Sequence, residues 1–421
     1  MITFQPTNWK KLQLSEVCDL QGGFAFKSKD FTQRGIPLVK ISNIKNLDIV
    51  MDNCVYVDSV KEQFLVSKDD ILIAMSGATT GKIGRYTLDK PAALNQRVGA
   101  FKPHQKLSSD YLFYVLQQDR VVSEWLKDAI GGAQPNINPS NVLDVEILLP
   151  SMEEQQKIAE FFSTIDKKID LIGQKIAEIE KLKTGLMQKL FSEGVGVQDE
   201  NGNWQPHTEF QDSPFGKVPK CWLKVSLENI ASVERGKFSA RPRNDPKYFG
   251  GNIPFVQTGD VVNAQLYVES YSQTLNELGL TVSKTFPPET ILITIAANIG
   301  DVAITQFPLA CPDSLVGIQA KKEICNSLWL FFFMQTQKSE LDSKATKSAQ
   351  KNINLQVLKP LTVFLPSLEE QELIAEILLA SEKKIALLKQ QKTETQQLKK
   401  GLMQKLLTGE WRVPVEETEA A

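Results

Sequence analysis

A long segment that occurs twice restricts the fold of this 421-residue chain more than any other feature. The first copy runs from Leu149-Pro150-Ser151 to Gly185-Leu186-Met187-Gln188-Lys189-Leu190, and the second from Leu365-Pro366-Ser367 to Gly401-Leu402-Met403-Gln404-Lys405-Leu406. The offset is 366 − 150 = 216 residues at the start and 401 − 185 = 216 residues at the end, so the copies align without a gap. Roughly half of the aligned positions are identical, which indicates an internal duplication.

Each copy is predicted to form one long helix with a coiled-coil seam. Pro150 breaks the chain before the helix, and Ser151 with Glu154 forms a capping-box pattern. Apolar residues then recur at alternating spacings of four and three, the 3.5-residue period of a coiled coil. An ordinary amphipathic helix is the alternative, but a helix of about 60 Å is long for a compact domain. The seam residues are Ile158, Phe162, Ile165, Ile169, Ile172, Ile176, Ile179, Leu186 and Leu190 in the first copy, and Ile374, Leu378, Ile385, Leu388, Leu402 and Leu406 in the second.

Polar residues interrupt the seam, mainly in the second copy. Lys183 occupies a seam position in the first copy, and Ser381, Lys392 and Thr395 do so in the second. We therefore expect the second helix to depend on a partner, and the first helix matches it in length and period. The two helices are predicted to pair as an antiparallel coiled coil with pseudo-two-fold symmetry.

A globular unit precedes each helix, and the two units share landmarks. Short segments rich in β-branched residues predict strands, without the regular alternation of strand and helix found in parallel sheets. We predict an α+β fold in which two similar mixed α/β domains are separated and followed by the long helices. The corresponding landmarks are Trp9 and Trp222, Gly35–Val39 and Asn252–Val256, and Ala133–Asn138 and Ala349–Asn354. The predicted division is 1–148 and 219–364 for the domains, 149–194 and 365–410 for the helices, 195–218 for a linker and 411–421 for a tail.

The sequence lacks the familiar patterns of catalytic and metal sites. Its five cysteines form no Cys-x-x-Cys pair, which argues against a structural zinc site and suits a reducing cytoplasm. Ser76–Lys82 resembles a phosphate-binding loop, but only three residues separate its glycines, and Ile83 stands where Ser or Thr should hold magnesium. The acidic pairs Glu153-Glu154 and Glu369-Glu370 lie in a first helical turn, where the helix dipole is enough to explain them. We predict no catalytic residue, metal site or cofactor in this chain.

Local basic and polar residues remain as candidates for binding. The net charge is −2, so any surface that binds nucleic acid must be local. Four basic residues lie between Arg235 and Arg243 beside Phe238, a pattern suited to phosphate and base contacts. Arginine commonly reads guanine, and Asn or Gln reads adenine, although an amide that caps a loop explains the amides equally well. The candidates for DNA binding are Lys27, Lys40, Lys82, Asn95, Gln96, Arg97, Arg235, Lys237, Arg241, Arg243, Gln257 and Asn298.

The complete pattern resembles the specificity (S) subunit of Type I restriction-modification systems. The resemblance rests on two globular units, each followed by a helix with a Leu-Pro-x-x-Glu-x-Gln opening and a Gly-Leu-Met-Gln-x-Leu close. The linker segment Asp212–Pro219 and the ending Leu407–Val413 also resemble that family.

The resemblance implies that the globular units are target-recognition domains, each reading one half of a bipartite site in double-stranded DNA. It also implies that the paired helices set the gap between the half-sites and dock two modification (M) subunits, which methylate adenine, and that restriction (R) subunits join them. S-adenosylmethionine, ATP and Mg would belong to those partners, and this chain would be a non-catalytic reader in the cytoplasm, away from membranes. The alternative from another class is a coiled-coil scaffold whose globular units bind protein.

Overall fold

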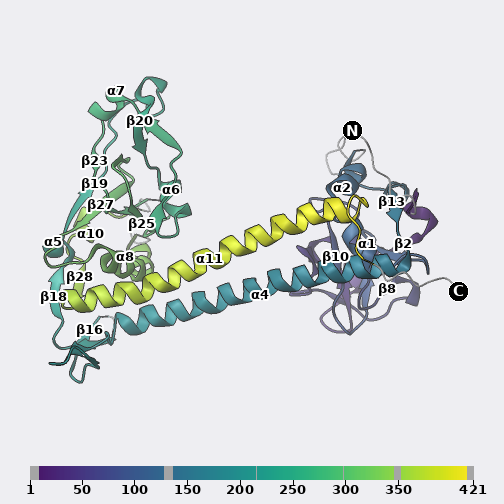
Figure 1. Cartoon of the computed structure of the whole chain (residues 1–421), viewed down its shortest axis with the longest axis horizontal. Helices are drawn as coiled ribbons and strands as arrows, with labels where there is room; N and C mark the ends of the chain where they lie inside the picture. The colour runs from purple at the N-terminus through teal and green to yellow at the C-terminus, as the bar shows by residue number, and fades with distance from the viewer. Residues whose placement is uncertain (1–8, 128–135, 215, 297, 346–351, 415–421) are drawn as a thin grey trace. The chain divides into compact units, whose positions relative to one another are not determined.

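Both copies of the repeated segment are continuous helices, as predicted: α4 spans Met152–Leu190 and α11 spans Leu368–Leu406. The structure is a computed structural model that describes residues 9–127, 136–214, 216–296, 298–345 and 352–414. The chain forms two compact units, Met1–Gly173 with Gln391–Ala421, and Gln174–Gln390. Each unit therefore contains one globular domain and part of each long helix, and within each unit the two helical parts lie side by side (Figure 1). The division of the chain into two domains, two helices, a linker and a tail at the boundaries given above stays a prediction.

Two mixed sheets form the first domain. The larger has the strand order β2-β12-β9-β10-β6-β5, and the smaller has the order β3-β7-β4-β11-β8. A separate pair joins β1 (Lys10–Gln13) to β13 (Glu146–Leu149), the strand that leads into α4. The sheet strands are β2 (Cys18–Gly22), β3 (Phe31–Thr32), β4 (Ile36–Val39), β5 (Ile44–Lys45), β6 (Leu47–Ile49), β7 (Tyr56–Val57), β8 (Leu65–Val66), β9 (Ile71–Ala74), β10 (Ile83–Arg85), β11 (Ala92–Leu94) and β12 (Val98–Pro103). The helices are α1 (Ser109–Val115), α2 (Asp119–Leu126) and α3 (Pro139–Leu143).

The second domain repeats this strand order. Its sheet β19-β27-β24-β25-β21 matches β2-β12-β9-β10-β6, and its sheet β22-β20-β26-β23 matches β7-β4-β11-β8. The parallel pairs also correspond, because β10–β6 matches β25–β21 and β4–β11 matches β20–β26. Two mixed domains with helices at their edges confirm the predicted α+β class. The strands are β18 (Leu223–Ser226), β19 (Ala231–Arg235), β20 (Phe249–Phe255), β21 (Tyr267–Val268), β22 (Gln273–Leu275), β23 (Thr285–Phe286), β24 (Ile291–Thr294), β25 (Val302–Thr305), β26 (Leu309–Ala310), β27 (Leu315–Ala320) and β28 (Thr362–Leu365).

Short helices and hairpins complete the second unit. The polar linker contains two hairpins, β14 (Val197–Gln198) with β15 (Trp204–Gln205), and β16 (Phe210–Ser213) with β17 (Gly216–Pro219). Strand β18 pairs with β28, which leads into α11 as β13 leads into α4. The helices are α5 (Leu227–Ile230), α6 (Thr258–Asn263), α7 (Glu277–Thr281), α8 (Ser327–Thr336), α9 (Lys338–Ala345) and α10 (Leu355–Leu358).

The long helices begin and end in the domain cores. In the first unit, Ile158 near the start of α4 is buried in the same cluster as Leu406 at the end of α11. In the second unit, Ile374 near the start of α11 shares a cluster with Leu190 at the end of α4. The start of one helix thus packs beside the end of the other in each unit, which is the antiparallel pairing that was predicted. All fifteen predicted apolar seam residues are buried or half-buried.

Equivalent ion pairs occupy the polar seam position in both units. Lys183 pairs with Glu382, and the residues that are their counterparts at the offset of 216, Lys399 and Asp166, also pair, with Nζ 2.6 Å from Oδ1. Each ammonium also lies over an aromatic ring, Phe332 for Lys183 and Tyr114 for Lys399. The break in the apolar pattern is therefore a repeated charged contact.

The remaining polar seam residues are accommodated locally. Ser381 and Thr395 donate their hydroxyl hydrogen bonds to carbonyl oxygens one turn earlier in their own helix. Lys392 lies against Gly173, where an added Cβ would be 3.2 Å from its Nζ. A glycine on α4 thus provides the space for a lysine on α11.

Candidate nucleic-acid interface

Loops of the first domain meet beyond the ends of its central strands. The amide of Asn95 donates to the carbonyl of Val39 at 3.0 Å, and the amide of Gln96 donates to the carbonyl of Phe24 at 2.9 Å. The carbonyl oxygens of Arg97 and Lys82 accept from Met75 and Ala74, respectively. These backbone bonds join residues 23–27, 40–43, 75–82, 95–97 and 136–138, called here the first loop cluster. They bring together all six candidates that the sequence placed in this domain.

A glycine allows the closest approach within this cluster. A Cβ on Gly23 would lie 2.1 Å from the carbonyl oxygen of Asn95, closer than any side chain tolerates. The second domain has Gly236 at the same point, where a Cβ would lie 2.3 Å from the carbonyl oxygen of Pro312. The close backbone crossing is therefore part of the repeated frame.

The first loop cluster presents its side chains in two ways. Lys27, Lys82, Gln96 and Arg97 are exposed, and no side-chain hydrogen bond to other described residues holds the last three. Lys40 and Asn95 are half-buried, with the Lys40 ammonium 4.3 Å from the centre of the Phe31 ring. The Asn95 side chain accepts from the amide of Arg97 at 3.3 Å, so this amide caps a turn, the alternative noted above.

The segment that resembles a phosphate-binding loop is a tight turn between β9 and β10. The amide of Thr80 donates to the carbonyl of Gly77 at 3.1 Å, and that of Lys82 donates to the carbonyl of Thr79 at 3.0 Å. A strand follows at Ile83, so the segment does not open a helix. Its geometry places Lys82 at the rim of the first loop cluster.

The second domain has an equivalent loop cluster. The amide of Lys237 donates to the carbonyl of Cys311 at 3.0 Å, and Ile295 donates to the carbonyl of Ser314 at 3.1 Å, as the corresponding residues do in the first domain. These bonds join residues 236–243, 257–260, 295–296, 298–301, 311–314 and 352–354, called here the second loop cluster. Arg235 lies directly before it, and the other five candidates of this domain lie within it. Of the recurring polar loop, Ala133–Pro135 and Ala349–Lys351 lie outside the described residues, whereas Asn136 and Asn352 form equivalent bridges to Ser76 and Ala296.

Asp313 organises two of the arginines in the second loop cluster. Arg235 donates from Nε to the Asp313 carbonyl oxygen at 2.5 Å, and Arg243 donates to its carboxylate at 2.8 Å. Arg241 instead donates to the carbonyl of Ala240 at 2.7 Å, within its own loop. Gln257 donates to the Gln273 amide oxygen at 2.9 Å. Sequence reasoning identified the arginines but missed the aspartate that orients them.

Asn298 borders a separate hollow. Its carbonyl oxygen accepts from the Thr294 hydroxyl, and its exposed side chain helps to line an open cavity of about 800 Å³. Lys338 of α9 reaches into the same wall, where its ammonium is 2.5 Å from Asp301. The hollow therefore extends the polar surface of the second loop cluster towards α8 and α9.

A buried glutamate anchors the start of each long helix, and here the expectation from sequence was wrong. Only the exposed Glu153 and Glu369 fit the account based on the helix dipole. Glu154 is 3% exposed and accepts from the Trp9 indole at 3.1 Å and from Arg412 at 2.6 Å. Glu370 is 2% exposed and accepts from the Trp222 indole at 2.9 Å. The recurrence of a tryptophan and a glutamate in both copies was the signal that could have revealed this contact.

The following glutamine completes each anchor. Gln155 donates to the carbonyls of Pro150 and Lys106, and its side-chain oxygen accepts from the amide of Ser108 at 2.8 Å. Gln371 makes the same set of bonds, including one at 2.9 Å from the amide of Asn326. The consecutive pairs Glu154-Gln155 and Glu370-Gln371 of the helix openings thus fix each helix to its domain.

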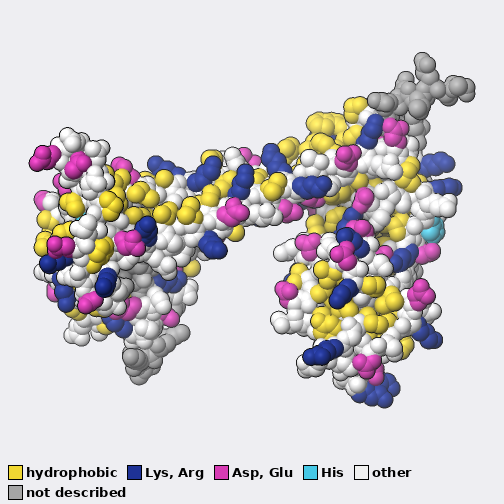
Figure 2. Space-filling view, turned by 90° about the horizontal axis from the view of Figure 1, so that it is seen from below, with side chains coloured by type: hydrophobic (Ala, Val, Ile, Leu, Met, Phe, Trp, Pro, Cys, Tyr) yellow, Lys and Arg dark blue, Asp and Glu magenta, His cyan; other side chains and the backbone are white. Residues whose placement is uncertain are grey.

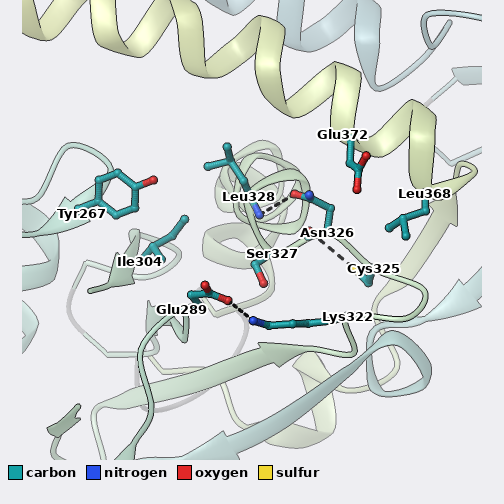
Figure 3. Close-up of a pocket in the computed structure, with 10 residues that line it drawn as sticks. All are labelled: Tyr267, Glu289, Ile304, Lys322, Cys325, Asn326, Ser327, Leu328, Leu368 and Glu372. Carbon is teal, nitrogen blue, oxygen red and sulfur yellow. Dashed lines mark hydrogen bonds and ion pairs between the residues drawn. The ribbon is translucent and has the colours of Figure 1, made fainter. Parts of the chain in front are cut away.

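A pocket of about 320 Å³ lies beside the second anchor (Figure 3). The side chain of Asn326 caps α8 by accepting from Leu328 and Trp329, and Lys322 pairs with Glu289 at 2.6 Å on another wall. Glu372 of α11 also lines the pocket. None of the predicted DNA-binding residues lines it, so it belongs to the joint between domain and helix.

Three of the five cysteines, Cys18, Cys311 and Cys325, are buried, whereas Cys54 is half-buried and Cys221 is exposed. Burial raises the pKa of the Cys18, Cys311 and Cys325 thiols to about 12, which keeps them protonated near neutral pH. Within the described ranges, no group of three or more His, Cys, Asp or Glu residues is arranged to hold a metal ion. In the same part of the chain, every helix is too short or too polar to cross a bilayer.

The repeated frame with two loop clusters matches a known family. Residues 6–181 and 219–397 each match the Type I restriction modification DNA specificity domain. The chain belongs to this family. The match to a specificity domain in both halves confirms the resemblance seen in the sequence and the prediction of a non-catalytic subunit, and it favours DNA recognition over the scaffold alternative.

Relatives of this specificity subunit are similar over nearly its whole length. It is 28% identical to the Type I restriction enzyme MjaX specificity subunit of Methanocaldococcus jannaschii, over 97% of this chain and 95% of the relative. It is 24% identical to the EcoBI specificity subunit of Escherichia coli, over 86% and 77%, respectively. A crystal structure of a Type I S subunit from M. genitalium aligns with a TM-score of 0.57 at 16% identity, covering 95% and 96% of the two chains. A chain from a study of Type I system assembly aligns with a TM-score of 0.60 at 19% identity, covering 97% and 99%. These two structures support the fold.

Proposed function

We propose that this specificity subunit reads a two-part DNA target, with one loop cluster for each part. The observation that carries the proposal is a shared frame with different polar side chains at equivalent loop positions. Corresponding hydrogen bonds in the two domains make Lys40 equivalent to Gln257, Lys82 to Asp301 and Gln96 to Asp313. Base pairs differ in the donors and acceptors that they present in the major groove, so two different sequences require two different sets of side chains.

The exposed residues of each cluster divide into two kinds of contact. Lys27, Lys82 and Arg97 are cations suited to phosphate oxygens, and Gln96 has the paired donor and acceptor that suit adenine. In the second cluster, Asp313 holds the Arg243 guanidinium at 2.8 Å, which orients it before DNA binds. Arginine in a fixed orientation suits the two acceptors of guanine.

The long helices have two further roles in this proposal. They set the gap between the half-sites, and they dock two modification subunits, to which restriction subunits are added. S-adenosylmethionine, ATP and Mg are assigned to those partners, and the complex is placed in the cytoplasm. The repeat at a constant offset of 216 residues supports the docking of two identical partners, because each would meet the same surface.

A domain exchange tests the two-part reading. Residues 219–364 are replaced by the corresponding segment of a relative, and methylated adenines are mapped on a plasmid library in the presence of the modification subunit. The hybrid is expected to keep one half of the target and to change the other. A change of both halves in several folded hybrids would contradict the proposal.

An insertion tests the setting of the gap. Four residues added between Gly173 and Lys183 lengthen one helix by about 6 Å, and a coiled coil tolerates this insertion better than one or two residues. The variant is expected to prefer targets with one or two more base pairs between unchanged half-sites, since DNA advances about 3.4 Å per base pair. An active variant with an unchanged preferred gap would restrict the helices to a docking role.

A further inference from the structure

The sequence similarity between α4 and α11 differs from one side of the helix to another. Several buried seam residues differ between the copies, for example Ile165 and Ser381, or Ile179 and Thr395. Many exposed residues are nevertheless identical. Packing alone would give the opposite distribution, since buried positions are normally the more restricted ones.

Identical residues that are exposed in at least one copy form one stripe from Lys167 to Lys189 and its counterpart, called here the shared face. Their spacing of three and four residues keeps them on one side of a helix with 3.6 residues per turn. The interruptions are Lys175 and Lys181, which are Gln391 and Gln397 in the second copy. The shared face comprises Lys167, Lys168, Leu171, Gln174, Glu178, Leu182, Gly185, Gln188 and Lys189 of α4, and Lys383, Lys384, Leu387, Gln390, Glu394, Leu398, Gly401, Gln404 and Lys405 of α11.

A second stripe, called here the divergent face, differs between the copies at six positions from 163 to 184, beyond which Met187 and Met403 are again identical. It comprises Ser163, Asp170, Gly173, Ala177, Glu180 and Thr184 of α4, and Leu379, Ala386, Lys389, Thr393, Gln396 and Lys400 of α11. In the second unit, Glu180 pairs with Lys389 at 3.1 Å, so the divergent faces of both helices lie on one side of the helix pair. The shared faces consequently lie together on the other side.

The shared face contains leucines that the chain itself leaves in solvent. Leu171 and Leu182 are 56% and 59% exposed, and their counterparts Leu387 and Leu398 are 47% and 59% exposed. The first unit presents Leu171 and Leu398, and the second unit presents Leu387 and Leu182. Lysines of the same face accompany each pair. Figure 2 shows hydrophobic side chains among basic and acidic ones on the surface of the long helices. Each unit thus offers the same apolar pair with similar surrounding charges, except that the second unit has Lys175 and Lys181 where the first has Gln391 and Gln397.

Duplication alone does not explain this distribution. Identity inherited from a recent duplication would fall on all sides of the helix, including the divergent face. A constraint on the shared face only, in both copies, indicates one kind of partner that contacts both. Exposed leucines among charged residues are also the composition of an interface centre rather than of a solvated surface.

We propose that the shared face of each unit is the docking surface for one modification subunit. The inference rests on the proposed function, which provides two copies of one partner, and it adds the residues that make the contact. Leu171 with Leu398 and Leu387 with Leu182 form the apolar centres. The lysines of the shared face require carboxylates on the partner, around an apolar patch that receives the leucines.

Paired substitutions in the full chain test this surface. The variant L182E/L387E alters the shared face of the second unit, L171E/L398E alters that of the first, and a third, fourfold variant combines all four substitutions. A177E/A386E introduces the same charges on the exposed divergent face of the second unit and is the matched control. Native mass spectrometry with purified modification subunit gives the number of partners per chain, titration gives the affinity, and circular dichroism verifies that the helices are intact.

The expected result is two partners per chain for the natural chain and the control, and one for each paired variant. Affinity at the altered surface should fall by about 30-fold or more, the usual range for central interface residues. Two partners on the fourfold variant, bound with the affinity of the natural chain, would overturn the inference and leave the proposed function intact. A natural chain that binds no modification subunit would instead refute the docking role in the proposed function.

Discussion

The two joints between domain and helix use the same buried glutamate with different partners. In the first unit, Glu154 accepts from Trp9 and from Arg412, which belongs to the segment after α11. In the second unit, Glu370 accepts from Trp222, from the amides of Val195 and Gly196, and lies 2.9 Å from His207 of the linker. The chain that follows each helix therefore supplies the donors.

This difference shows which part of the joint is constant. The glutamate and the indole belong to the duplicated frame, whereas the remaining donors are whatever the next segment provides. Arg412 keeps its charge at all relevant pH values, and its contact is partly exposed. Glu370 is enclosed more completely, because its side chain and that of His207 are 3% and 4% exposed. The second joint should therefore depend more strongly on its glutamate.

Removing the glutamates is expected to have the largest effect and to separate the two joints. Glu370→Ala leaves two amides and an indole buried without an acceptor, which costs about 3–5 kcal/mol. Glu154→Ala leaves one indole and a partly exposed arginine, and should cost about 2 kcal/mol. Denaturant unfolding followed by site-resolved hydrogen exchange measures both. Equal losses would show that the enclosure of Glu370 has no energetic consequence.

The ion pairs in the seam should be equivalent, in contrast to the joints. Glu382→Leu leaves Lys183 half-buried without its carboxylate, and Asp166→Leu does the same to Lys399. Each substitution is expected to lower the free energy of unfolding by about 2–3 kcal/mol. A second substitution of the lysine by leucine should recover most of this loss, because a buried ion pair gives little net stability. Double-mutant cycles for both pairs provide the measurement. Coupling energies that differ by more than about 1 kcal/mol would mean that the units differ in the seam as well.

The loop clusters should differ in specificity while sharing their frame. Gln96→Ala is expected to reduce the discrimination between bases at one position of one half-site by about 1–3 kcal/mol. Arg243→Ala is expected to have the same effect at one position of the other half-site. Arg241→Ala should have a smaller effect, because Arg241 is bound to its own loop. Binding to a library of targets with the modification subunit present distinguishes these cases. Uniform weakening across all sequences would instead assign the residue to a phosphate.

Alkaline pH should destabilise both units, the second through two buried thiols and the first through one thiol and the buried phenols of Tyr111 and Tyr114, whose pKa burial also raises; this is the smallest expected effect. The folded thiols of Cys311 and Cys325 have a pKa of about 12, as does Cys18 in the first unit, whereas unfolded thiols ionise near pH 9. The unfolded chain therefore binds fewer protons between these values, and stability falls by about 1.4 kcal/mol per thiol and pH unit. Pulse alkylation of each cysteine in denaturant at pH 8 and pH 10 gives the change in the free energy of unfolding of each unit between these pH values. If C311A/C325A shows the same change as the natural chain, other groups cause it.

Sequence alone determined the features that depend on local pattern and on repetition. The spacing of apolar residues from Ile158 to Leu190 specifies the helix and its seam, because only one side of a helix can be buried against a partner. The exact offset between the copies revealed the duplicated frame, and a family with specific motifs gave the function. The arginines near Phe238 could be identified as surface cations for the same reason, since clustered charge is visible without a fold.

Tertiary structure decided which distant residues share a contact. Asp313 lies 70 residues from Arg243, and Glu154 lies 258 residues from Arg412, so no local pattern links them. The same strand order in both domains depends on pairings between distant segments, and side-chain periodicity within a single strand does not specify its neighbour. The role of Glu154 and Glu370 was misjudged for this reason. A first-turn glutamate favours the helix dipole in any sequence, and only burial beside an indole makes it an anchor.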